Sequence, residues 1–260
     1  MNYDKIRLEI DDGIAVLSLN DPGTMNAISI PLQQEVREAL AVIRQDASVR
    51  ALLLTGSERA FCSGAELGSL GGGRVGESVG RMMRELSNPL ILDLQQLPVP
   101  VVAAVNGAAA GAGVSIALAA DIVIAARSAY FMLTFMPRLG LIPDLGATWQ
   151  LPRLIGRARA MGLTLLGERL PAEQAAEWGL IWACVDDAAL MEEARALAER
   201  LANAPAHAAL EARRAFAVAE TNDFPVQLDY EAERQQELIE SEAFREGVRA
   251  FLEKRAPKFR

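Results

Sequence analysis

The sequence predicts a single α/β core followed by a helical region, and three observations point to this fold class. Short apolar runs at residues 51–55, 99–105 and 122–126 alternate with segments of helical periodicity. Strands that are apolar on both faces are typical of a parallel sheet covered by helices on each side. The second half is mainly helical in pattern, and no low-complexity linker or internal repeat divides the halves. We therefore expect one compact core whose C-terminal helices pack on a neighbouring copy.

The first half opens with a hairpin signal. Residues 6–10 and 14–19 have strand character and flank the turn Asp11-Asp12-Gly13. Residues 32–44 have helical periodicity, and the glycine-rich residues 69–76 predict a mobile loop. The remaining predicted elements of this half are a helix at 79–97 interrupted near Asn88-Pro89, a strand at 99–105, a helix at 111–120 and a strand at 122–126.

Helical patterns fill the second half. Residues 145–151 and 157–166 predict two helices separated by a break at Pro152-Arg153, because proline cannot continue helical hydrogen bonding. A short helix at 171–177 ends at Trp178-Gly179. Amphipathic helices are predicted at 188–203, 205–220, 226–240 and 244–255.

Composition excludes several functional classes. The formal net charge is -8, and an acidic surface repels nucleic acid. His207 is the single histidine and no Cys-x-x-Cys pair is present, so we expect no metal site. The two cysteines make no disulfide framework, the N-terminus lacks the order of a signal peptide, and glycines and polar residues break the longest apolar region, 98–126. We expect no membrane span and a cytoplasmic location.

The first candidate binding segment is residues 61–67, with the sequence FCSGAEL, which follows the strand at 51–55. Small residues let backbone N–H groups approach a ligand closely. An ordinary strand-to-helix turn has the same composition, and the segment alone favours that interpretation. Glu66 is expected to cap or pair locally.

The second segment is residues 104–115, with the sequence AVNGAAAGAGVS, which joins a buried strand to a helix. Free N–H groups at a helix start carry a partial positive charge and could stabilise a thioester enolate. Ile116 stands where a dinucleotide-binding G-x-G-x-x-G pattern needs its last glycine, so that pattern fails. The stretch around Ser115 weakly resembles a serine nucleophile elbow. We interpret Ser115 as a packing residue, because the one possible base, His207, lies on an amphipathic helix and is expected to face solvent.

The third segment, residues 139–148 with the sequence LGLIPDLGAT, sets Asp144 among apolar residues at a predicted helix start. Asp144 is either the helix N-cap or a general base whose pKa is raised by desolvation. The segment alone leaves both open. Asp121, which lies between two apolar runs, is interpreted as a structural, hydrogen-bonded residue.

Taken in order, these segments resemble the crotonase (enoyl-CoA hydratase/isomerase) superfamily. They match its F-C-[AS]-G-x-[DE]-L, A-V-N-G-x-A-x-G-x-G and L-G-[LI]-x-P-x-x-G-x-T patterns. Residues 20–28 resemble its adenine-side loop, and residues 251–259 resemble its C-terminal ending. Within the family, residues 121–129, 140–144, 156–163 and 177–182 are similar to the ring-1,2-epoxyphenylacetyl-CoA isomerase of bacterial phenylacetate degradation.

The resemblance implies a crotonase spiral of strand-strand-helix units with a C-terminal helical trimerisation region. We place the spiral core with its acyl-CoA site at residues 1–200 and the oligomerisation region at 201–260, as a homotrimer or hexamer. The oxyanion hole falls on the backbone N–H groups of Ala65 and Ala112. CoA enters as part of the substrate, with no other cofactor, and its contacts fall on Met25, Ala27, Ala65, Leu67, Lys258 and Phe259, the last two open to contribution from a neighbouring subunit.

The resemblance also favours an isomerase over a hydratase. The family's hydratases use two glutamates, and the corresponding positions here fall at Ser115 and at Phe135 or Met136, none of them acidic. Asp144 remains, and one carboxylate suffices to remove a proton from one carbon and return it to another. Leu141, Ile142 and Leu145 are expected to raise the pKa of Asp144 by desolvation.

The expected activity is therefore the isomerisation of an unsaturated or ring-epoxide acyl-CoA, in fatty-acid or phenylacetate metabolism. Two alternatives stay open. One is an enoyl-CoA hydratase that has rebuilt its acid/base pair from other residues, and the other is a non-catalytic CoA-binding homologue.

Overall fold

The protein is described by a computed structural model over residues 3–66 and 75–259, and its core is built on two sheets. The larger sheet has six strands in the order β1-β2-β3-β5-β7-β10, and the smaller has four in the order β4-β6-β8-β9. The strands of the larger sheet are β1 (Ile6–Asp11), β2 (Ile14–Leu19), β3 (Ala51–Gly56), β5 (Val101–Val105), β7 (Ile122–Ala126) and β10 (Ala183–Val185).

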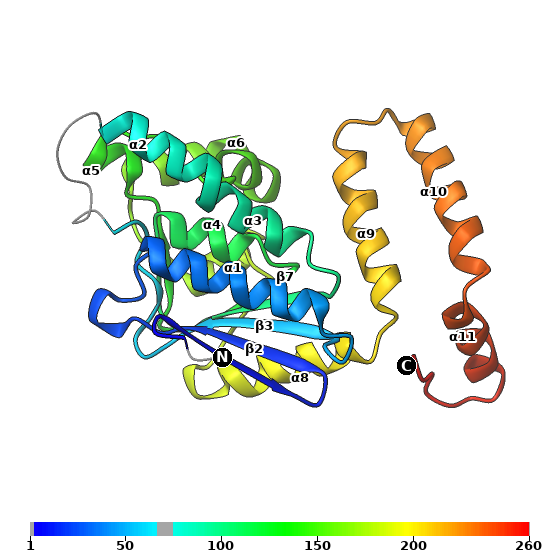
Figure 1. Ribbon diagram of the computed structural model, residues 1–260. Helices are drawn as coiled ribbons and strands as arrows, with labels where there is room; N and C mark the ends of the chain where they lie inside the picture. The colour runs from blue at the N-terminus through cyan, green and yellow to red at the C-terminus, as the bar shows by residue number, and fades with distance from the viewer. Residues whose placement is uncertain (1–2, 67–74, 260) are drawn as a thin grey trace.

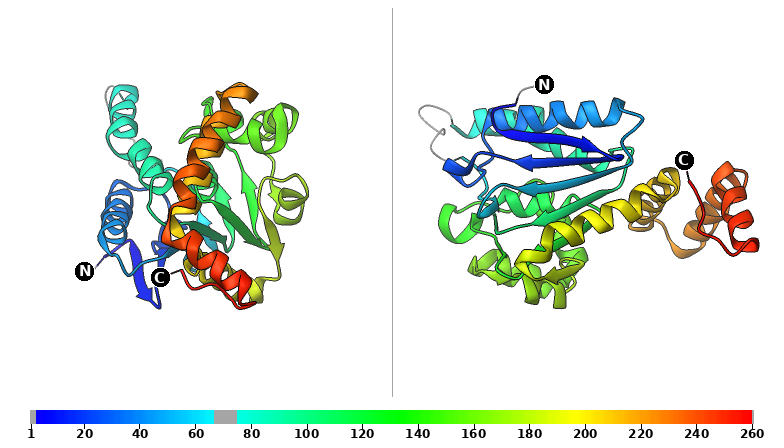
Figure 2. Two further views of the ribbon diagram at one scale, coloured as in Figure 1. Left: turned by 90° about the vertical axis from the view of Figure 1, so that its right-hand side faces the viewer. Right: turned by 90° about the horizontal axis from the view of Figure 1, so that it is seen from below.

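The larger sheet begins with the predicted hairpin and continues as a parallel sheet. β1 and β2 pair antiparallel, with Ile6 opposite Leu19 and Asp11 opposite Ile14. Every later neighbour in this sheet is parallel. Helices α1 (Ile30–Gln45) and α8 (Leu190–Ala202) cover its opposite faces (Figures 1 and 2), which explains why β3 and β5 are buried almost throughout.

The smaller sheet consists of very short strands that follow the longer ones along the chain. They are β4 (Ala60–Cys62), β6 (Ala108–Ala110), β8 (Tyr130–Met132) and β9 (Leu170–Pro171). β3-β4, β5-β6 and β7-β8 are each followed by helices, in the order α2 (Val75–Met82) with α3 (Asn88–Gln95), α4 (Ala112–Leu118) and α5 (Phe135–Leu139). This repeated strand-strand-helix order confirms the predicted spiral.

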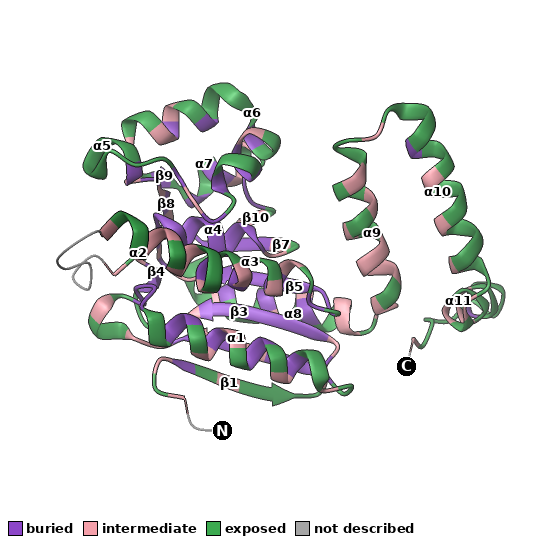
Figure 3. Ribbon diagram, turned by 45° about the horizontal axis from the view of Figure 1, so that its top comes forward, coloured by how far each residue is buried: buried purple, intermediate pink, exposed green. Residues whose placement is uncertain are grey.

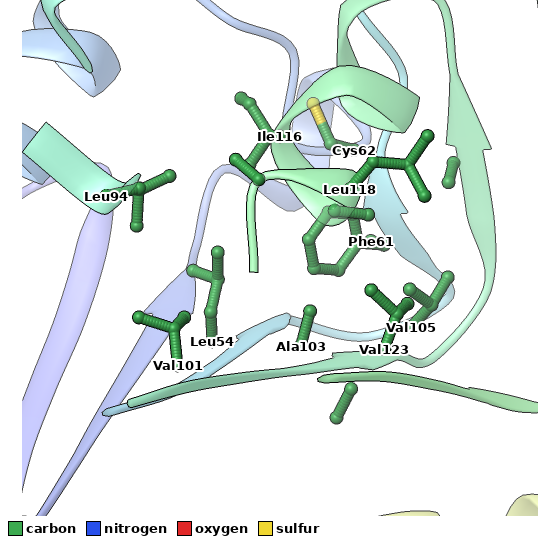
Figure 4. Packing of buried hydrophobic residues seen from close by; sticks show 14 of the residues in the cluster. Leu54, Phe61, Cys62, Leu94, Val101, Ala103, Val105, Ile116, Leu118 and Val123 are labelled. Atoms are coloured by element: carbon green, nitrogen blue, oxygen red, sulfur yellow. The ribbon is translucent and has the colours of Figure 1, made fainter. Parts of the chain in front are cut away.

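Phe61 of β4 joins the core of the two sheets. Its side chain is fully buried. Figure 4 shows the ring between Leu118 of α4 and the β5 residues Ala103 and Val105. Because Phe61 is fixed on both sides, the chain that follows it leaves the core at a defined place beside α4.

One helix interruption differs from its predicted position, and a second lies near the predicted Asn88-Pro89. Helix α6 (Ala147–Leu166) continues through Pro152 and instead kinks at Gly156, where φ is 76° and ψ is 159°. Glycine adopts this conformation freely, so the kink moves to the residue that accommodates it. The helix from Val75 to Gln95 contains a π-helical stretch, Met83–Ser87, directly before Pro89. A wider turn accommodates the proline ring without ending the helix.

Of the predicted glycine-rich loop, residues 69–74 lie outside the described residues, and Val75 and Gly76 open α2. The helices after α6 lie close to their predicted positions. They are α7 (Ala172–Glu177), α8, α9 (Ala206–Ala219), α10 (Phe224–Ile239) and α11 (Glu242–Leu252).

Helices α9, α10 and α11 form a C-terminal arm that stands apart from the core (Figures 1 and 2). Figure 3 shows almost no buried residue on the arm, and α9 has none. Large apolar side chains are exposed along it, including Phe216 at 78% and Phe251 at 82%. The predicted packing of this arm on a neighbouring copy stays a prediction.

Arg213 of α9 ties the arm to the core. Its Nε and Nη2 atoms donate to the two carboxylate oxygens of Asp121 at 2.8 and 2.6 Å, and Nη1 donates to the carbonyls of Gln95 and Leu97 at 2.6 and 3.0 Å. Asp121 also accepts the Val101 N–H at 2.7 Å. The structural interpretation of Asp121 is therefore confirmed.

Replacing Arg213 by methionine is expected to loosen the arm, because it leaves the Asp121 carboxylate, whose side chain is 29% exposed, and backbone carbonyls without their charged donor. The expected loss of stability is about 2 kcal/mol. Hydrogen exchange of the α9 amides measures the effect. Arg214→Met is the matched control, since Arg214 pairs with Glu211 inside the same helix. Equal protection of α9 in both variants would contradict the role given to Arg213.

Candidate active site

The loop between β2 and α1 lies against the loop that follows β4. The N–H of Ile28 donates to the Gly64 carbonyl at 2.8 Å, and the N–H of Ser63 donates to the Met25 carbonyl at 3.1 Å. The Ser63 hydroxyl donates to the Thr24 carbonyl at 2.9 Å. These bonds bring Met25 and Ala27 beside Ala65, so three of the predicted site residues are together.

Asn26 fixes the conformation of this region, and sequence reasoning gave it no role. It is fully buried with a positive φ of 58°. Its side-chain oxygen accepts the Asp21 N–H at 2.8 Å, and its amide donates to the Ala60 and Ser57 carbonyls at 2.8 and 3.2 Å. Asparagine tolerates left-handed backbone and supplies both donors and an acceptor, which is why it suits this position. The neighbouring Met25 remains exposed, whereas Ala27 is buried.

The predicted oxyanion donors lie where two turns meet. Gly64 has φ of +95°, and a Cβ atom on it would lie 2.8 Å from the Ala110 carbonyl oxygen and 3.5 Å from the Ala112 nitrogen. The turns that carry Ala65 and Ala112 therefore approach more closely than a side chain at residue 64 would allow. Ala112 is the first residue of α4, so its N–H has no acceptor within the helix. Ala65 is exposed.

Asp144 lies in the turn before α6, and its side chain does not cap that helix. The N-cap of α6 is Gly146, with no side-chain hydrogen bond. Asp144 Oδ1 is buried and has no hydrogen-bond partner among the residues that the structure describes. Burial raises the pKa of Asp144 from 3.8 to about 6. The N-cap alternative is therefore wrong, and the general-base alternative stays a prediction.

The apolar surroundings of Asp144 differ from the prediction. Leu145 is buried, as expected, and so is Pro143, which precedes Asp144 in the sequence. The desolvating role was wrong for Leu141 and Ile142, whose side chains are 54% and 77% exposed. The chain leaves α5 through a left-handed Gly140 and then runs along the surface until Pro143.

The positions that correspond to the hydratase glutamates hold no acid. Ser115 is fully buried in α4, and its hydroxyl donates to the Asp144 carbonyl at 2.9 Å. The packing interpretation of Ser115 was therefore incomplete. Phe135 is buried and Met136 is part of the exposed surface. Among the described residues, no three His, Cys, Asp or Glu side chains come together in a way that could hold a metal ion.

Lys258 and Phe259 lie far from the other predicted site residues within one chain. The Lys258 N–H donates to Glu246 at 2.9 Å, and the Phe259 carbonyl accepts from Arg50 at 3.0 Å. Arg50 directly precedes β3, whereas the site lies beyond the carboxyl end of that strand, about 20 Å away for six residues. Leu67 lies outside the described residues, and His207 is exposed on the arm.

A family model described as enoyl-CoA hydratase/isomerase matches residues 9–260. The chain belongs to this family. A relative from Rhodobacter capsulatus described as a "probable enoyl-CoA hydratase" is 49% identical over 259 residues, covering 100% of this chain and 99% of that protein. The 1,2-epoxyphenylacetyl-CoA isomerase of Escherichia coli is 46% identical over 252 residues, covering 96% of each protein.

The crotonase fold is also shared with solved structures. The crystal structure of an enoyl-CoA hydratase from Bacillus anthracis has a TM-score of 0.91 and 34% identity, covering 99% of this chain and 100% of that chain. The crotonase resemblance and the similarity to the epoxyphenylacetyl-CoA isomerase are thus confirmed. The chain is an enzyme of the enoyl-CoA hydratase/isomerase type, and in the described part of the structure no helix is long and apolar enough to cross a membrane.

Proposed function

We propose that this crotonase is an isomerase of unsaturated or ring-epoxide acyl-CoA thioesters, with Asp144 as its single acid/base residue. The observation that carries the proposal is the Asp144 carboxyl group, whose Oδ1 is buried without a partner in the described ranges 3–66 and 75–259 and whose pKa is raised to about 6. By resemblance to the family, the two glutamates of a hydratase would stand at Ser115 and at Phe135 or Met136, and none of these is acidic. CoA is part of the substrate, and the proposal includes no further cofactor.

In the proposed reaction, the thioester carbonyl oxygen accepts hydrogen bonds from the N–H groups of Ala65 and Ala112. Ionised Asp144 removes a proton from the α-carbon, and the electron pair moves onto the thioester oxygen as a dienolate. The protonated carboxyl group then returns the same proton to the γ-carbon, and the double bond moves into conjugation. No water is consumed. Each oxyanion donor is worth about 3 kcal/mol of transition-state stabilisation.

We also propose that the protein self-associates as a homotrimer or hexamer. The exposed Phe216 and Phe251 of the arm support this, because large apolar side chains that stand open to water favour burial against a partner. The position of Lys258 and Phe259, away from the rest of the site, supports contact with CoA bound to a neighbouring copy.

The decisive assay compares two substrates on the wild-type protein. One reaction follows the conversion of a 3-enoyl-CoA to the conjugated 2-enoyl-CoA, and the other follows hydration of crotonyl-CoA. We expect isomerisation with negligible hydration. Substantial hydration would favour the hydratase alternative, and tight CoA binding without proton exchange on any acyl-CoA would favour a non-catalytic homologue.

The isomerase is expected to lose activity in acid with a midpoint near pH 6. The base must be ionised, so kcat/KM should be level above the pKa of about 6 and fall about tenfold per pH unit below it. Measuring kcat/KM from pH 4.5 to 8 tests this. A midpoint near 4, or activity that falls as the pH rises through 6, would contradict the assignment of Asp144 as base.

A further inference from the structure

The Asp144 carbonyl accepts two hydrogen bonds from different parts of the chain. The Ala147 N–H donates to it at 3.0 Å and closes a four-residue turn. The Ser115 hydroxyl donates to it at 2.9 Å from helix α4, which is 29 residues earlier in the sequence. Ser115 has no exposed surface. This hydroxyl therefore links the interior of α4 directly to the residue proposed as the base.

The turn that carries Asp144 has a backbone conformation that needs support. Leu145 has φ of 49° and Gly146 has φ of 88°, so both central residues are left-handed. This suits Gly146, whereas a leucine in this region costs about 1–2 kcal/mol. Leu145 is buried, which holds it from one side. The Ser115 bond holds the turn from the other side.

A second hydrogen bond fastens the start of α6 to the same helix. The side-chain amide of Gln150 donates to the Leu118 carbonyl at 3.2 Å, at the last residue of α4. The first residue of α4 is Ala112, the proposed oxyanion donor, and Ser115 lies three residues later, about 4.5 Å along the helix axis. Helix α4 thus supports both proposed functional groups, the oxyanion donor through its own backbone and the base through Ser115.

Among the described residues, charged groups near this turn do not account for the raised pKa of Asp144. Helix α4 and the first turn of α6 carry no ionisable side chain, and Arg138 of α5 is exposed. Burial is the first cause of the raised pKa of Asp144, and no charged residue in the described part of the chain contributes to it. The hydration of the Asp144 carboxylate therefore depends on how deeply the turn buries this side chain.

We infer that Ser115 is a positioning residue for the reaction, because its hydroxyl holds the Asp144 carbonyl and so sets the place of the carboxylate relative to the Ala112 N–H. This inference rests on the proposed function of Asp144. Ser115 does not touch the reacting atoms. Its role is to hold the strained turn in the conformation in which the Asp144 carboxylate is partly buried.

The test compares Ser115→Ala with Thr55→Val. Ser115→Ala removes the hydroxyl with almost no change in volume, and the Asp144 carbonyl keeps the Ala147 N–H, so folding is preserved. Thr55→Val is the matched control, since the buried Thr55 hydroxyl also donates to a backbone carbonyl, that of Ala104 at 2.8 Å, within the larger sheet. Asp144→Asn is measured beside them. Carboxyl carbon NMR titration, with the Asp144→Asn spectrum as reference, reports the pKa of Asp144 without any substrate.

For Ser115→Ala we expect kcat to fall about 10- to 100-fold, because a displacement of about 1 Å is enough for such a loss. KM should stay within about twofold, as expected when substrate contacts are unchanged. The pKa of Asp144 should fall by about one unit as water reaches the carboxylate, and the acid limb of kcat should move with it. Thr55→Val should change none of these.

Wild-type kcat and an unmoved pKa in Ser115→Ala would overturn the inference. So would an equal loss of kcat in Thr55→Val, or a loss of kcat in Ser115→Ala with the pKa unmoved, since both indicate a general effect on folding. A different result would show that the proposed function of Asp144 is wrong. If Asp144→Asn kept full isomerase activity while Ser115→Ala still shifted the pKa of Asp144, Asp144 would not be the base, and Ser115 would still position it.

Discussion

Asp144→Asn is expected to lower kcat for isomerisation by about 10²- to 10⁴-fold, the usual contribution of a general base. Asparagine has nearly the same shape but cannot take a proton from carbon. Exchange of the substrate α-hydrogen with deuterated solvent should be lost together with isomerisation, because both begin with the same proton removal. Steady-state rates and the exchange rate followed by NMR measure the effect.

The stability of Asp144→Asn separates lost chemistry from lost folding. The folded-state pKa of Asp144 is about 6, above the ordinary value of about 3.9, so wild-type stability from this group is present below pH 4 and is lost as the pH rises through 6. Removing the charge should therefore stabilise the protein at pH 7 by about 1–2 kcal/mol, after allowing for partial solvation, and should give no gain at pH 4. Isomerase activity near wild type, or hydratase turnover that survives the change, would show that the single-carboxylate mechanism is wrong.

Gly64→Ala is expected to remove most of the activity by separating the two oxyanion donors. The residue has φ of +95°, and the added Cβ would lie 2.8 Å from the Ala110 carbonyl oxygen, a contact that the backbone must move to relieve. Loss of one oxyanion donor lowers kcat about 10²- to 10³-fold. KM for the acyl-CoA should change much less, because the donors act mainly on the developing charge.

Gly179→Ala is the control for Gly64→Ala. Gly179 also has a positive φ, 79°, but the nearest atom to an added Cβ is 3.8 Å away. Both variants therefore carry backbone strain, and only Gly64→Ala carries the close contact between the two turns. If the two variants lost the same small fraction of kcat, the close approach of these turns would not matter for the reaction.

The sequence predicted the long elements of the fold and missed the short ones. Strands such as β3 are apolar over most of their length, so their burial is visible in the pattern. The three alanines of β6 carry no strand pattern, and their pairing with β4 and β8 depends on chain that is distant in sequence. The kink at Gly156 was also predicted at the wrong residue. The sequence shows which residues can interrupt a helix, but not at which of them the fold requires an interruption.

The sequence indicated candidate residues of the site, but not the hydrogen bonds that connect them. Asp144 stood out because a lone carboxylate among apolar residues is uncommon. Whether it capped α6 depended on the direction of its side chain, which the pattern does not encode. The bond from Ser115 to the Asp144 carbonyl joins residues 29 positions apart, and no local spacing indicates it. The buried bonds of Asn26 are hidden for the same reason.

The contacts of Arg213 and the predicted oxyanion donors lie at opposite ends of the strands of the larger sheet. Arg213 donates to Asp121, directly before β7, and to the carbonyls of Gln95 and Leu97, shortly before β5. Each of these contacts is therefore near the amino end of a strand. Ala65 follows β3 and β4, and Ala112 follows β5 and β6, so both lie beyond the carboxyl ends of β3 and β5. A second contact connects the arm to the candidate site, because Arg153 of α6 donates to Glu220 at the end of α9 at 2.9 Å, and α6 is the helix that follows the Asp144 turn. In a lineage built on this scaffold, substitutions that change how the arm assembles are therefore expected to change the chemistry as well.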